Sequence, residues 1–209
     1  RRRQRQMCIR DRDLRDDVAH AMAETPAVAA QLHLPLQSGS DSVLAAMHRG
    51  YTAERFLDKL AMARRLVPDL SVSTDVIVGF PGENVDEFEQ TLAVVKAARF
   101  DSAFMVQYSP RPGTPAASMP DQVSPDAVRE RFDQLVVLQT AIPFERNQAR
   151  VGRVELVLTE GPSRRDAEIA TTRSEGNRIV HVPGSFEAGR FMNVRVTRAA
   201  PHYLEGTVV

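Results

Sequence analysis

Cysteine is almost absent from this chain of 209 residues, where Cys8 is the single example. One thiol can build neither a disulfide framework nor a cysteine-ligated cluster, so we expect no metal site made by this chain alone. No stretch approaches the roughly 18 apolar residues that a membrane span needs, and the N-terminus lacks the apolar region of a signal peptide. These absences predict a cytoplasmic protein without a membrane partner.

Net charge is absent as well, because 27 basic residues balance 27 acidic ones. This balance excludes the strongly basic signature of many nucleic-acid binders, so any contact with RNA must be local. Lysine is scarce, with only Lys59 and Lys96, and arginine carries nearly all of the positive charge. Arginine offers a planar fork to phosphate, although a bias in codon usage explains the same composition.

The first twelve residues, RRRQRQMCIRDR, contain six arginines and no apolar period. Without them the chain holds 21 basic and 26 acidic residues, so the body of the protein is mildly acidic. We interpret residues 1–12 as a basic arm that is either disordered or foreign to the fold, and we favour the second interpretation.

Helical and extended segments alternate from residue 13 to about residue 150. The periodicity predicts helices over about 14–25, 41–47, 52–67, 85–98 and 124–150, and strands over 32–36, 72–78 and 103–108. A polar or Gly/Pro turn follows each strand. This order is typical of a parallel α/β sheet or barrel, in which sites gather at the C-terminal ends of the strands.

The pattern becomes all-β after residue 150. Apolar and polar residues alternate along 154–158 and 192–197, and glycines separate the segments. About five short strands in roughly 60 residues predict a small barrel of the oligonucleotide-binding type. We therefore expect two domains, residues 13–150 and 151–209, joined by the long helix that ends near Arg150.

Polar residues follow the first two predicted strands. The turn that begins with Gln37 and Ser38 offers an amide and hydroxyls to a sugar, although a capped turn that opens a helix explains the same residues. Asp75 lies in a β-branched strand that ends at Gly79, where a carboxylate is costly without a partner. A vicinal diol is one suitable partner, and backbone amides at a strand edge are the alternative.

The third turn, Ser109-Pro110-Arg111-Pro112-Gly113-Thr114-Pro115, is stiffened by prolines. Such a loop can present Arg111 in a fixed position to an anionic ligand. A solvated arginine on a rigid surface loop is the alternative.

Four segments occur together in this order: HLPLQSGSDSVLAAMHRGYT, STDVIVGFPGE, FMVQYSPRPGTPAA and GRVELVLTEG. They resemble the radical S-adenosylmethionine (SAM) methylthiotransferase family, and the resemblance runs from about residue 13 to residue 209. Within the family they are most similar to the type that modifies N(6)-dimethylallyladenosine in tRNA. Types that act on threonylcarbamoyladenosine or on a ribosomal protein are alternatives, and a cluster-free RNA-binding module is a further one.

The resemblance implies the C-terminal half of a radical SAM core, which is a partial TIM-like parallel barrel, followed by a TRAM barrel that binds RNA. Members of the family also carry three cysteines for an auxiliary 4Fe-4S cluster and a CxxxCxxC motif for the SAM cluster. Both cysteine sets are missing here. We therefore expect an incomplete enzyme that is inactive by itself, with SAM and two 4Fe-4S clusters belonging to the full-length protein.

The resemblance also implies roles for individual residues. In the expected SAM-binding set, Gln37 and Asp75 bind the ribose hydroxyls and Arg49 pairs with the SAM carboxylate. Ile77 and Gly79 form an apolar floor beneath adenine, and Ser38 lies beside Gln37. For Arg49 the alternative is a solvated charge at a helix C-terminus. Candidate RNA contacts are Arg111, Arg173, Arg178 and Arg195.

The implied reaction is radical transfer of a methylthio group to carbon 2 of the modified adenosine, with sulfur from the auxiliary cluster. The expected partners are the anticodon stem-loop of tRNA and an external electron donor, and the full-length enzyme is expected to be a monomer. Charge alone does not indicate RNA, because the region after Arg150 has eight arginines and seven acidic residues.

Overall fold

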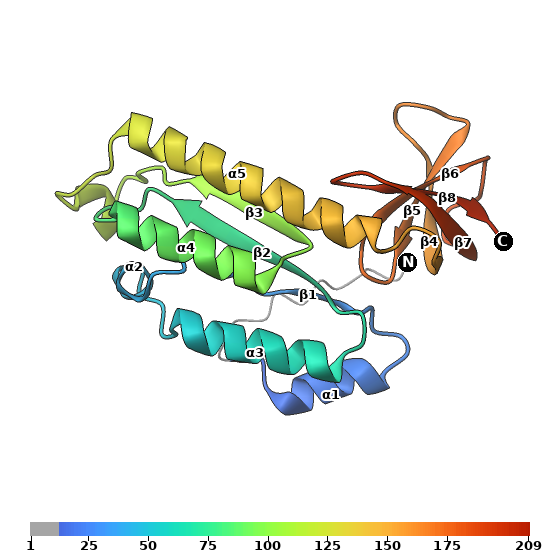
Figure 1. The fold of residues 1–209 in the computed structure, drawn as a ribbon, viewed down its shortest axis with the longest axis horizontal. Coiled ribbons are helices and arrows are strands. Elements are labelled where there is room, and N and C mark those ends of the chain that lie inside the picture. The colour runs from blue at the N-terminus through green and yellow to red at the C-terminus, as the bar shows by residue number, and fades with distance from the viewer. Residues whose placement is uncertain (1–12) are drawn as a thin grey trace.

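The computed structural model describes residues 13–209 and arranges them as an α/β core domain and a β-barrel (Figure 1). The predicted basic arm, residues 1–12, lies outside the described residues. The elements of the core domain are α1 (Asp16–Glu24), β1 (Gln31–His33), α2 (Asp41–Ala46), α3 (Ala53–Leu66), β2 (Ser71–Val78), α4 (Val85–Ala98), β3 (Ser102–Gln107), a short 3₁₀ helix (Pro115–Ser118) and α5 (Pro125–Gln148).

The helices begin where the sequence places their caps. The Thr52 and Asn84 side chains accept hydrogen bonds from the third backbone amides of α3 and α4, and Ser124 does the same for α5. Each cap satisfies a backbone donor that has no partner inside its helix. The predicted bounds of 85–98 agree with those of α4, and α5 continues through Pro143 to form the predicted connector.

The sheet of the core domain is parallel, with the order β1-β2-β3. The predicted first strand, residues 32–36, is wrong in its extent, because β1 ends at His33. Pro35 has no amide hydrogen to donate, and the next amide, that of Leu36, donates to the Thr74 hydroxyl instead of a strand carbonyl. The ladder resumes at an isolated bridge between Gln37 and Val76.

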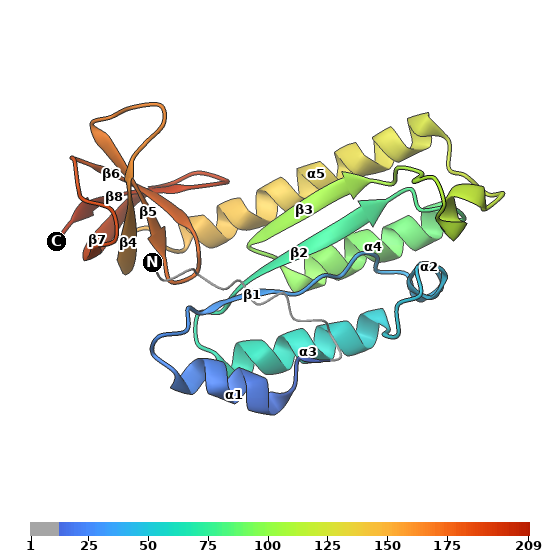
Figure 2. The ribbon, with the colours of Figure 1, turned by 180° about the vertical axis from the view of Figure 1, so that it is seen from behind.

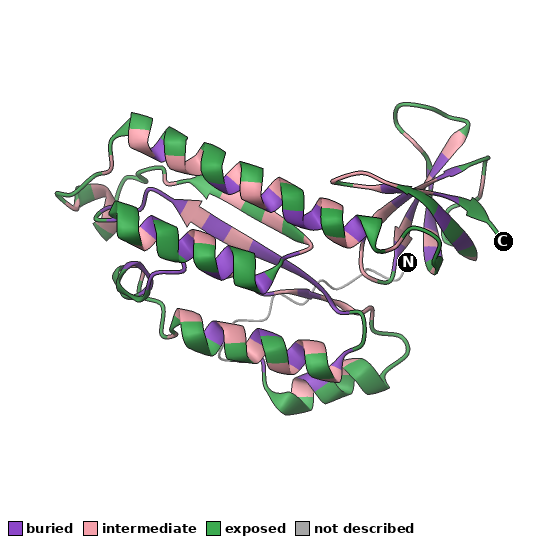
Figure 3. Ribbon diagram, in the orientation of Figure 1, coloured by how far each residue is buried: buried purple, intermediate pink, exposed green. Residues whose placement is uncertain are grey.

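The two faces of the sheet differ in burial. On β2, Val72, Val76 and Val78 are fully buried under the helices, and they form part of the main core. Among the described residues nothing covers the opposite face in this way, since Phe104 and Val106 on β3 are 66% and 48% exposed. Figure 2 shows this open face in front of the helices, and Figure 3 shows that β2 is largely buried whereas β3 is exposed along much of its length.

The barrel contains β4 (Val154–Pro162), β5 (Ile169–Ser174), β6 (Ile179–Pro183), β7 (Phe191–Ala199) and β8 (Leu204–Val208). These strands close in the order β4-β5-β6-β8-β7, as the all-β pattern predicts. Closure pairs both edges of the sheet and leaves no edge strand open. The interior is a separate core cluster of Val157, Val180, Val182, Val194, Val196 and Leu204.

The barrel lies at the N-terminal end of the core strands, and the arrowheads of β2 and β3 point away from it (Figure 1). Asp101, which precedes β3, forms ion pairs with Arg178 of the barrel and with Arg146 of α5, the latter at 2.7 Å. Asn147 donates to the Ala200 carbonyl at 2.8 Å and accepts from Arg178 at 3.2 Å. Charged and polar contacts therefore join the two domains.

No helix within residues 13–209 combines the length and apolar character needed to cross a bilayer.

Candidate functional site

The candidate site lies at the C-terminal edge of the parallel sheet, where the first two motif turns meet. The backbone amide of Gln37 donates to the backbone carbonyl of Asp75 at 2.7 Å. The backbone amide of Ile77 donates to the backbone carbonyl of Gln37 at 2.9 Å. Residues almost 40 positions apart are thereby adjacent. The sheet brings together three of the residues that the sequence singled out, as the rule for parallel sheets predicts.

The Asp75 carboxylate points to the open face and is paired with a residue that sequence reasoning missed. His33 Nε2 lies 3.3 Å from Asp75 Oδ2, and His33 Nδ1 lies 2.9 Å from the Ser73 hydroxyl. The Asp75 side chain still keeps 36% of its surface exposed. His33 therefore orients an accessible carboxylate. The only signal for His33 in the sequence was its position in an extended segment, and such a position does not identify a partner.

Three polar atoms near this edge are buried without a partner among residues 13–209. They are Gln37 Oε1, Glu83 Oε1 and Tyr108 Oη. Gln37 also has a φ of +66°, which is uncommon for a residue other than glycine. Tyr108 follows β3 and packs edge-on against Phe80 with ring centroids 5.4 Å apart. Unpaired buried polar atoms in a native protein call for an explanation, and a polar ligand is one.

The turn after β2 is held by a buried carboxylate. Glu83, whose side chain has no exposed surface, accepts from the Gly79 amide at 2.8 Å and from Arg131 of α5 at 3.0 Å. Burial raises the pKa of Glu83, while its bonds to Gly79 and Arg131 oppose that rise. Gly79 has a φ of +78°, and a Cβ there would lie 2.4 Å from a methyl group of Val128. The approach of α5 therefore requires a glycine at position 79.

Ser38 is placed differently from the ligand-binding role expected for it. It is fully buried, its hydroxyl lies 3.3 Å from the Thr91 hydroxyl, and it accepts from the Ser40 amide. The neighbouring Gly39 amide also donates to Thr91, at 2.9 Å. Ser38 thus fastens the turn to α4 instead of presenting a hydroxyl to a ligand.

Arg49 is exposed just after α2 and forms no ion pair with the described residues. Its backbone amide donates to Leu44 at 2.8 Å, which closes the end of the helix. The segment is tied back to the first strand by Tyr51, whose hydroxyl donates to the carbonyls of Pro35 and Leu36 at 3.2 and 2.9 Å. This tether holds the Arg49 segment close to the residues that precede Gln37.

The four candidate RNA contacts lie in different surroundings. Arg111 is exposed in its loop, and Arg195 is exposed on β7. Arg173 is half-buried and paired with Glu160 at 3.1 Å. Arg178 is in the domain interface with 8% of its side chain exposed and is paired with Asp101, so it is not accessible to a phosphate. Burial lowers the pKa of Arg178, and Asp101 opposes that change.

No three His, Cys, Asp or Glu side chains of residues 13–209 lie close enough together to hold a metal ion. Cys8 lies outside this range.

Comparisons with known proteins agree with this architecture. The model of the radical SAM superfamily matches residues 3–95, and the model of the TRAM domain matches residues 148–209. The tRNA-2-methylthio-N(6)-dimethylallyladenosine synthases of Acidothermus cellulolyticus and Kineococcus radiotolerans are each 54% identical to this chain, over 92% and 91% of its length. The synthase of Mycobacteroides abscessus is 50% identical over 90%.

The chain belongs to the radical SAM methylthiotransferase family. It spans about two fifths of the length of these relatives, with 40% of the Acidothermus protein and 39% of the other two covered. The family predicted from the four motifs is confirmed. The superfamily match begins at residue 3, within the predicted basic arm, and the interpretation of that arm as foreign stays a prediction.

The fold is confirmed by a solved structure as well. Coproporphyrinogen III oxidase (HemN) from Escherichia coli, a radical SAM enzyme, superposes with a TM-score of 0.55 over 80% of this chain and 45% of that protein. At 14% sequence identity this likeness shows the fold alone. The radical SAM family implies SAM and 4Fe-4S clusters in the full-length enzyme.

Proposed function

We propose that this chain is part of a tRNA methylthiotransferase, which adds a methylthio group to carbon 2 of N(6)-dimethylallyladenosine next to the anticodon. The observation that carries the proposal is the 54% identity to synthases of that name, which extends over both domains. The parallel sheet with its polar C-terminal edge and the TRAM barrel beside it support the same function.

The residues at the sheet edge fit SAM. Gln37 Oε1 lacks a partner among residues 13–209, and the Asp75 carboxylate is accessible and oriented by His33, so both can bind ribose hydroxyls. Arg49 has no competing carboxylate in the described chain and can pair with that of SAM. Ile77 is half-buried on the open face, next to Asp75, and offers an apolar contact to adenine. When bound, SAM and a reduced 4Fe-4S cluster supply the one-electron chemistry.

The proposed partner is the anticodon stem-loop of tRNA, which the TRAM barrel would hold through backbone contacts and base stacking. An external electron donor, a monomeric full-length enzyme and a cytoplasmic location complete the proposal. Within this chain we now assign the RNA contacts to Arg111, Arg173 and Arg195, because the surroundings of Arg178 are those of a domain interface.

The substrate is tested in a strain that lacks the full-length gene. Mass spectrometry of its tRNA should show loss of the 2-methylthio group and accumulation of N(6)-dimethylallyladenosine. Loss from threonylcarbamoyladenosine, or from a ribosomal protein, with the dimethylallyl modification intact would contradict the proposed substrate.

The SAM site is tested by returning variants of the full-length gene to that strain. Asp75→Asn should weaken SAM binding by about tenfold or more and reduce the modification, because it removes a charged hydrogen-bond acceptor. Asp86→Asn, on the exposed side of α4, is the matched control and should restore full modification. Equal restoration by both variants would remove Asp75 from the site.

A role for this chain as an RNA-binding module by itself is a second candidate. The closed barrel favours it, because such a barrel has its own core and does not depend on the sheet edge for an RNA surface. Binding of the 209-residue chain to an anticodon stem-loop that weakens with salt would support this role. Binding that is absent at low salt would exclude it.

A further inference from the structure

The outer surface of β4 and β7 is an exposed face of unusual composition. The residues that alternate with the barrel interior face outward there, and we call them the β4/β7 face: Val154, Leu156, Leu158, Phe191, Asn193 and Arg195. In register, Phe191 lies opposite Leu158 and Arg195 lies opposite Val154. These six residues are apolar except for one amide and one positive charge. The next outward-facing residue of β4, Glu160, is exposed and is paired with Arg173 of β5 at 3.1 Å.

Phe191 is the most exposed aromatic residue of this surface, with 70% of its area accessible. Within the described chain its ring makes no contact with another aromatic ring. Leu156 and Val154 on the neighbouring strand are also exposed, at 42% and 47%. A contiguous exposed group of aromatic and aliphatic side chains is typical of an interaction site, whereas single exposed apolar residues are ordinary on protein surfaces.

Arg195 supplies a positive charge that the fold does not neutralise. Of the seven other arginines after Arg150, five form ion pairs with acidic residues: Arg153, Arg173, Arg178, Arg190 and Arg198. Arg164 and Arg165, exposed in the loop between β4 and β5, also lack an ion pair among residues 13–209, but they lie outside the β4/β7 face. Arg195 has no ion-pair partner among residues 13–209, and one of its guanidinium nitrogens donates to the Gly152 carbonyl at 3.1 Å. This bond fixes the side chain and leaves its charge available.

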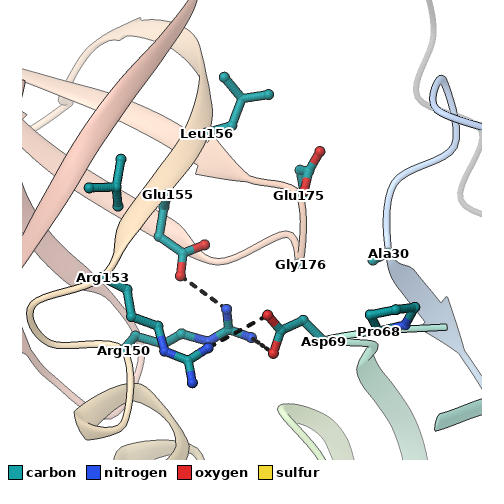
Figure 4. Close-up of a pocket in the computed structure, with 10 residues that line it drawn as sticks. Ala30, Pro68, Asp69, Arg150, Arg153, Glu155, Leu156, Glu175 and Gly176 are labelled. Atoms are coloured by element: carbon teal, nitrogen blue, oxygen red, sulfur yellow. Dashed lines mark hydrogen bonds and ion pairs between the residues drawn. The ribbon is translucent and has the colours of Figure 1, made fainter. Parts of the chain in front are cut away.

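The face continues into a cavity between the barrel and the core domain. The cavity has a volume of about 430 Å³, and Val154 and Leu156 form its barrel side while Pro68 and Asp69 form its core side (Figure 4). Arg150 spans it and is paired with Asp69 at 3.3 Å and with Glu155 of β4. Val154, which lines this cavity, is the register partner of Arg195, so Arg195 lies on the neighbouring strand beside a residue of the cavity wall.

We propose that the β4/β7 face binds a single-stranded segment of RNA, with a base stacked on Phe191 and a backbone phosphate at Arg195. This inference rests on the proposed tRNA function and adds the surface and the residues that would recognise the RNA. Every base has a π-face, so stacking on an exposed ring needs no particular sequence. Arg195 has no carboxylate among the six residues of the face, and the adjoining Glu160 is paired with Arg173, so the Arg195 charge complements a phosphate.

Because Phe191 and Arg195 lie four residues apart on one strand, their positions differ by about 13 Å along it. A base and a phosphate so far apart belong to different nucleotides of an extended strand. The face is therefore expected to bind more than one nucleotide, and the adjoining cavity lies beside the phosphate position.

The test measures binding of the 209-residue chain to a synthetic anticodon stem-loop RNA by fluorescence anisotropy, at several salt concentrations. Phe191→Ala should weaken binding by about 5-fold to about 150-fold without changing the salt dependence, since stacking is not ionic. Phe191→Tyr should keep the affinity, because tyrosine retains the stacking ring. Arg195→Gln should weaken binding and reduce the slope of log K against log salt by about one.

Matched controls come from the exposed side of α5. Val137→Ala removes a side chain that is 72% exposed, and Arg129→Gln removes an exposed arginine, and neither should change the affinity. Thermal unfolding of each variant confirms that the fold is kept. Unchanged binding in both Phe191→Ala and Arg195→Gln, with the wild-type chain still binding RNA, would overturn the assignment of this face alone.

Two other outcomes have separate meanings. If the wild-type chain does not bind the stem-loop at low salt, the RNA partner of the proposed function fails first and this inference fails with it. If light scattering shows a wild-type dimer that Phe191→Ala converts to a monomer while RNA affinity is kept, the face binds a second copy of the chain and the RNA assignment is overturned.

Discussion

At the scale of single residues, Glu83 is the side chain on which the turn after β2 depends. It joins the Gly79 amide to Arg131 of α5 and has no exposed surface. Glu83→Ala should lower the free energy of unfolding by about 3 kcal/mol, because the buried Gly79 amide loses its acceptor and the nearly buried Arg131 loses its opposite charge. Urea unfolding measures the change. Glu89→Ala, at an exposed position of α4, is the control and should have little effect.

The ionisation of Glu83 gives a second prediction. Its pKa in the folded state is raised above the ordinary 4.5 by burial, so the folded protein binds a proton here more readily than the unfolded chain does. The stability that Glu83 provides should therefore fall as the pH rises from about 4.5 through the folded-state pKa, and then stay constant. As the pH rises through this range, urea unfolding should show the free energy of unfolding of the wild type falling relative to that of the Glu83→Gln variant. A shift in favour of the wild type would contradict it.

Gly79 is constrained twice, by its backbone angle and by the approach of Val128. Gly79→Ala should cost about 3 kcal/mol, of which part is collision with the valine and part is the positive φ. In the double variant with Val128→Ala, the collision is relieved but the backbone strain is kept. A double-mutant cycle by urea unfolding should therefore give a favourable coupling of at least about 0.5 kcal/mol, and additive losses would show that the two residues do not collide.

At the scale of elements, local sequence signals govern where the helices begin. Asn84 and Glu87 form a capping box at the start of α4, with bonds of 2.9 and 2.8 Å. Asn84→Ala should cost about 1 kcal/mol by urea unfolding, since the backbone amide of Glu87 loses its side-chain acceptor. Gln90→Ala, which is exposed on the same helix and has no capping role, should be nearly neutral. A larger loss at position 90 than at 84 would refute the capping role.

The strands were less predictable than the helices. The β-branched run 72–78 indicated β2 almost to the residue, because its centre is buried on one face and paired on both edges. The run 32–36 did not, because Pro35 interrupts the ladder and the Thr74 hydroxyl takes over a backbone bond. A side chain from another strand decided the end of β1, and no local pattern reports it.

At the scale of the whole molecule, Arg178 connects the barrel to the core domain through Asp101 and Asn147. Arg178→Met should loosen the barrel, because Asp101 keeps its bonds to Arg146 and to the Val72 amide while the barrel loses its most buried charged contact. The more exposed pairs at Asp69 remain. Small-angle scattering should show a larger radius of gyration, and calorimetry should show two transitions that lie further apart. Each domain should keep its own secondary structure by circular dichroism.

Arg198→Met is the matched control for this prediction. Arg198 is also an ion-paired arginine of the barrel, but its side chain is 69% exposed and its partner, Glu205, belongs to the same domain. It should change neither the radius of gyration nor the separation of the transitions. Identical behaviour of the two variants would mean that Arg178 does not hold the domains together.

The sequence by itself determined the order of helices and strands, the parallel core domain followed by a barrel, and the family, because these depend on local periodicity and on ordered motifs. It also singled out Gln37 and Asp75, and the resemblance added Ile77; the parallel sheet brings these three residues together at one edge.

Only the tertiary structure decided which side chains are available. Ser38 is bonded to Thr91, His33 orients Asp75, and Arg178 is paired with an aspartate 77 residues away. The physical reason is that the partner of a polar side chain is set by the register and packing of segments that lie far apart in the chain. Arg195 and Arg178 look alike in the sequence, and only the fold leaves one exposed and buries the other between domains.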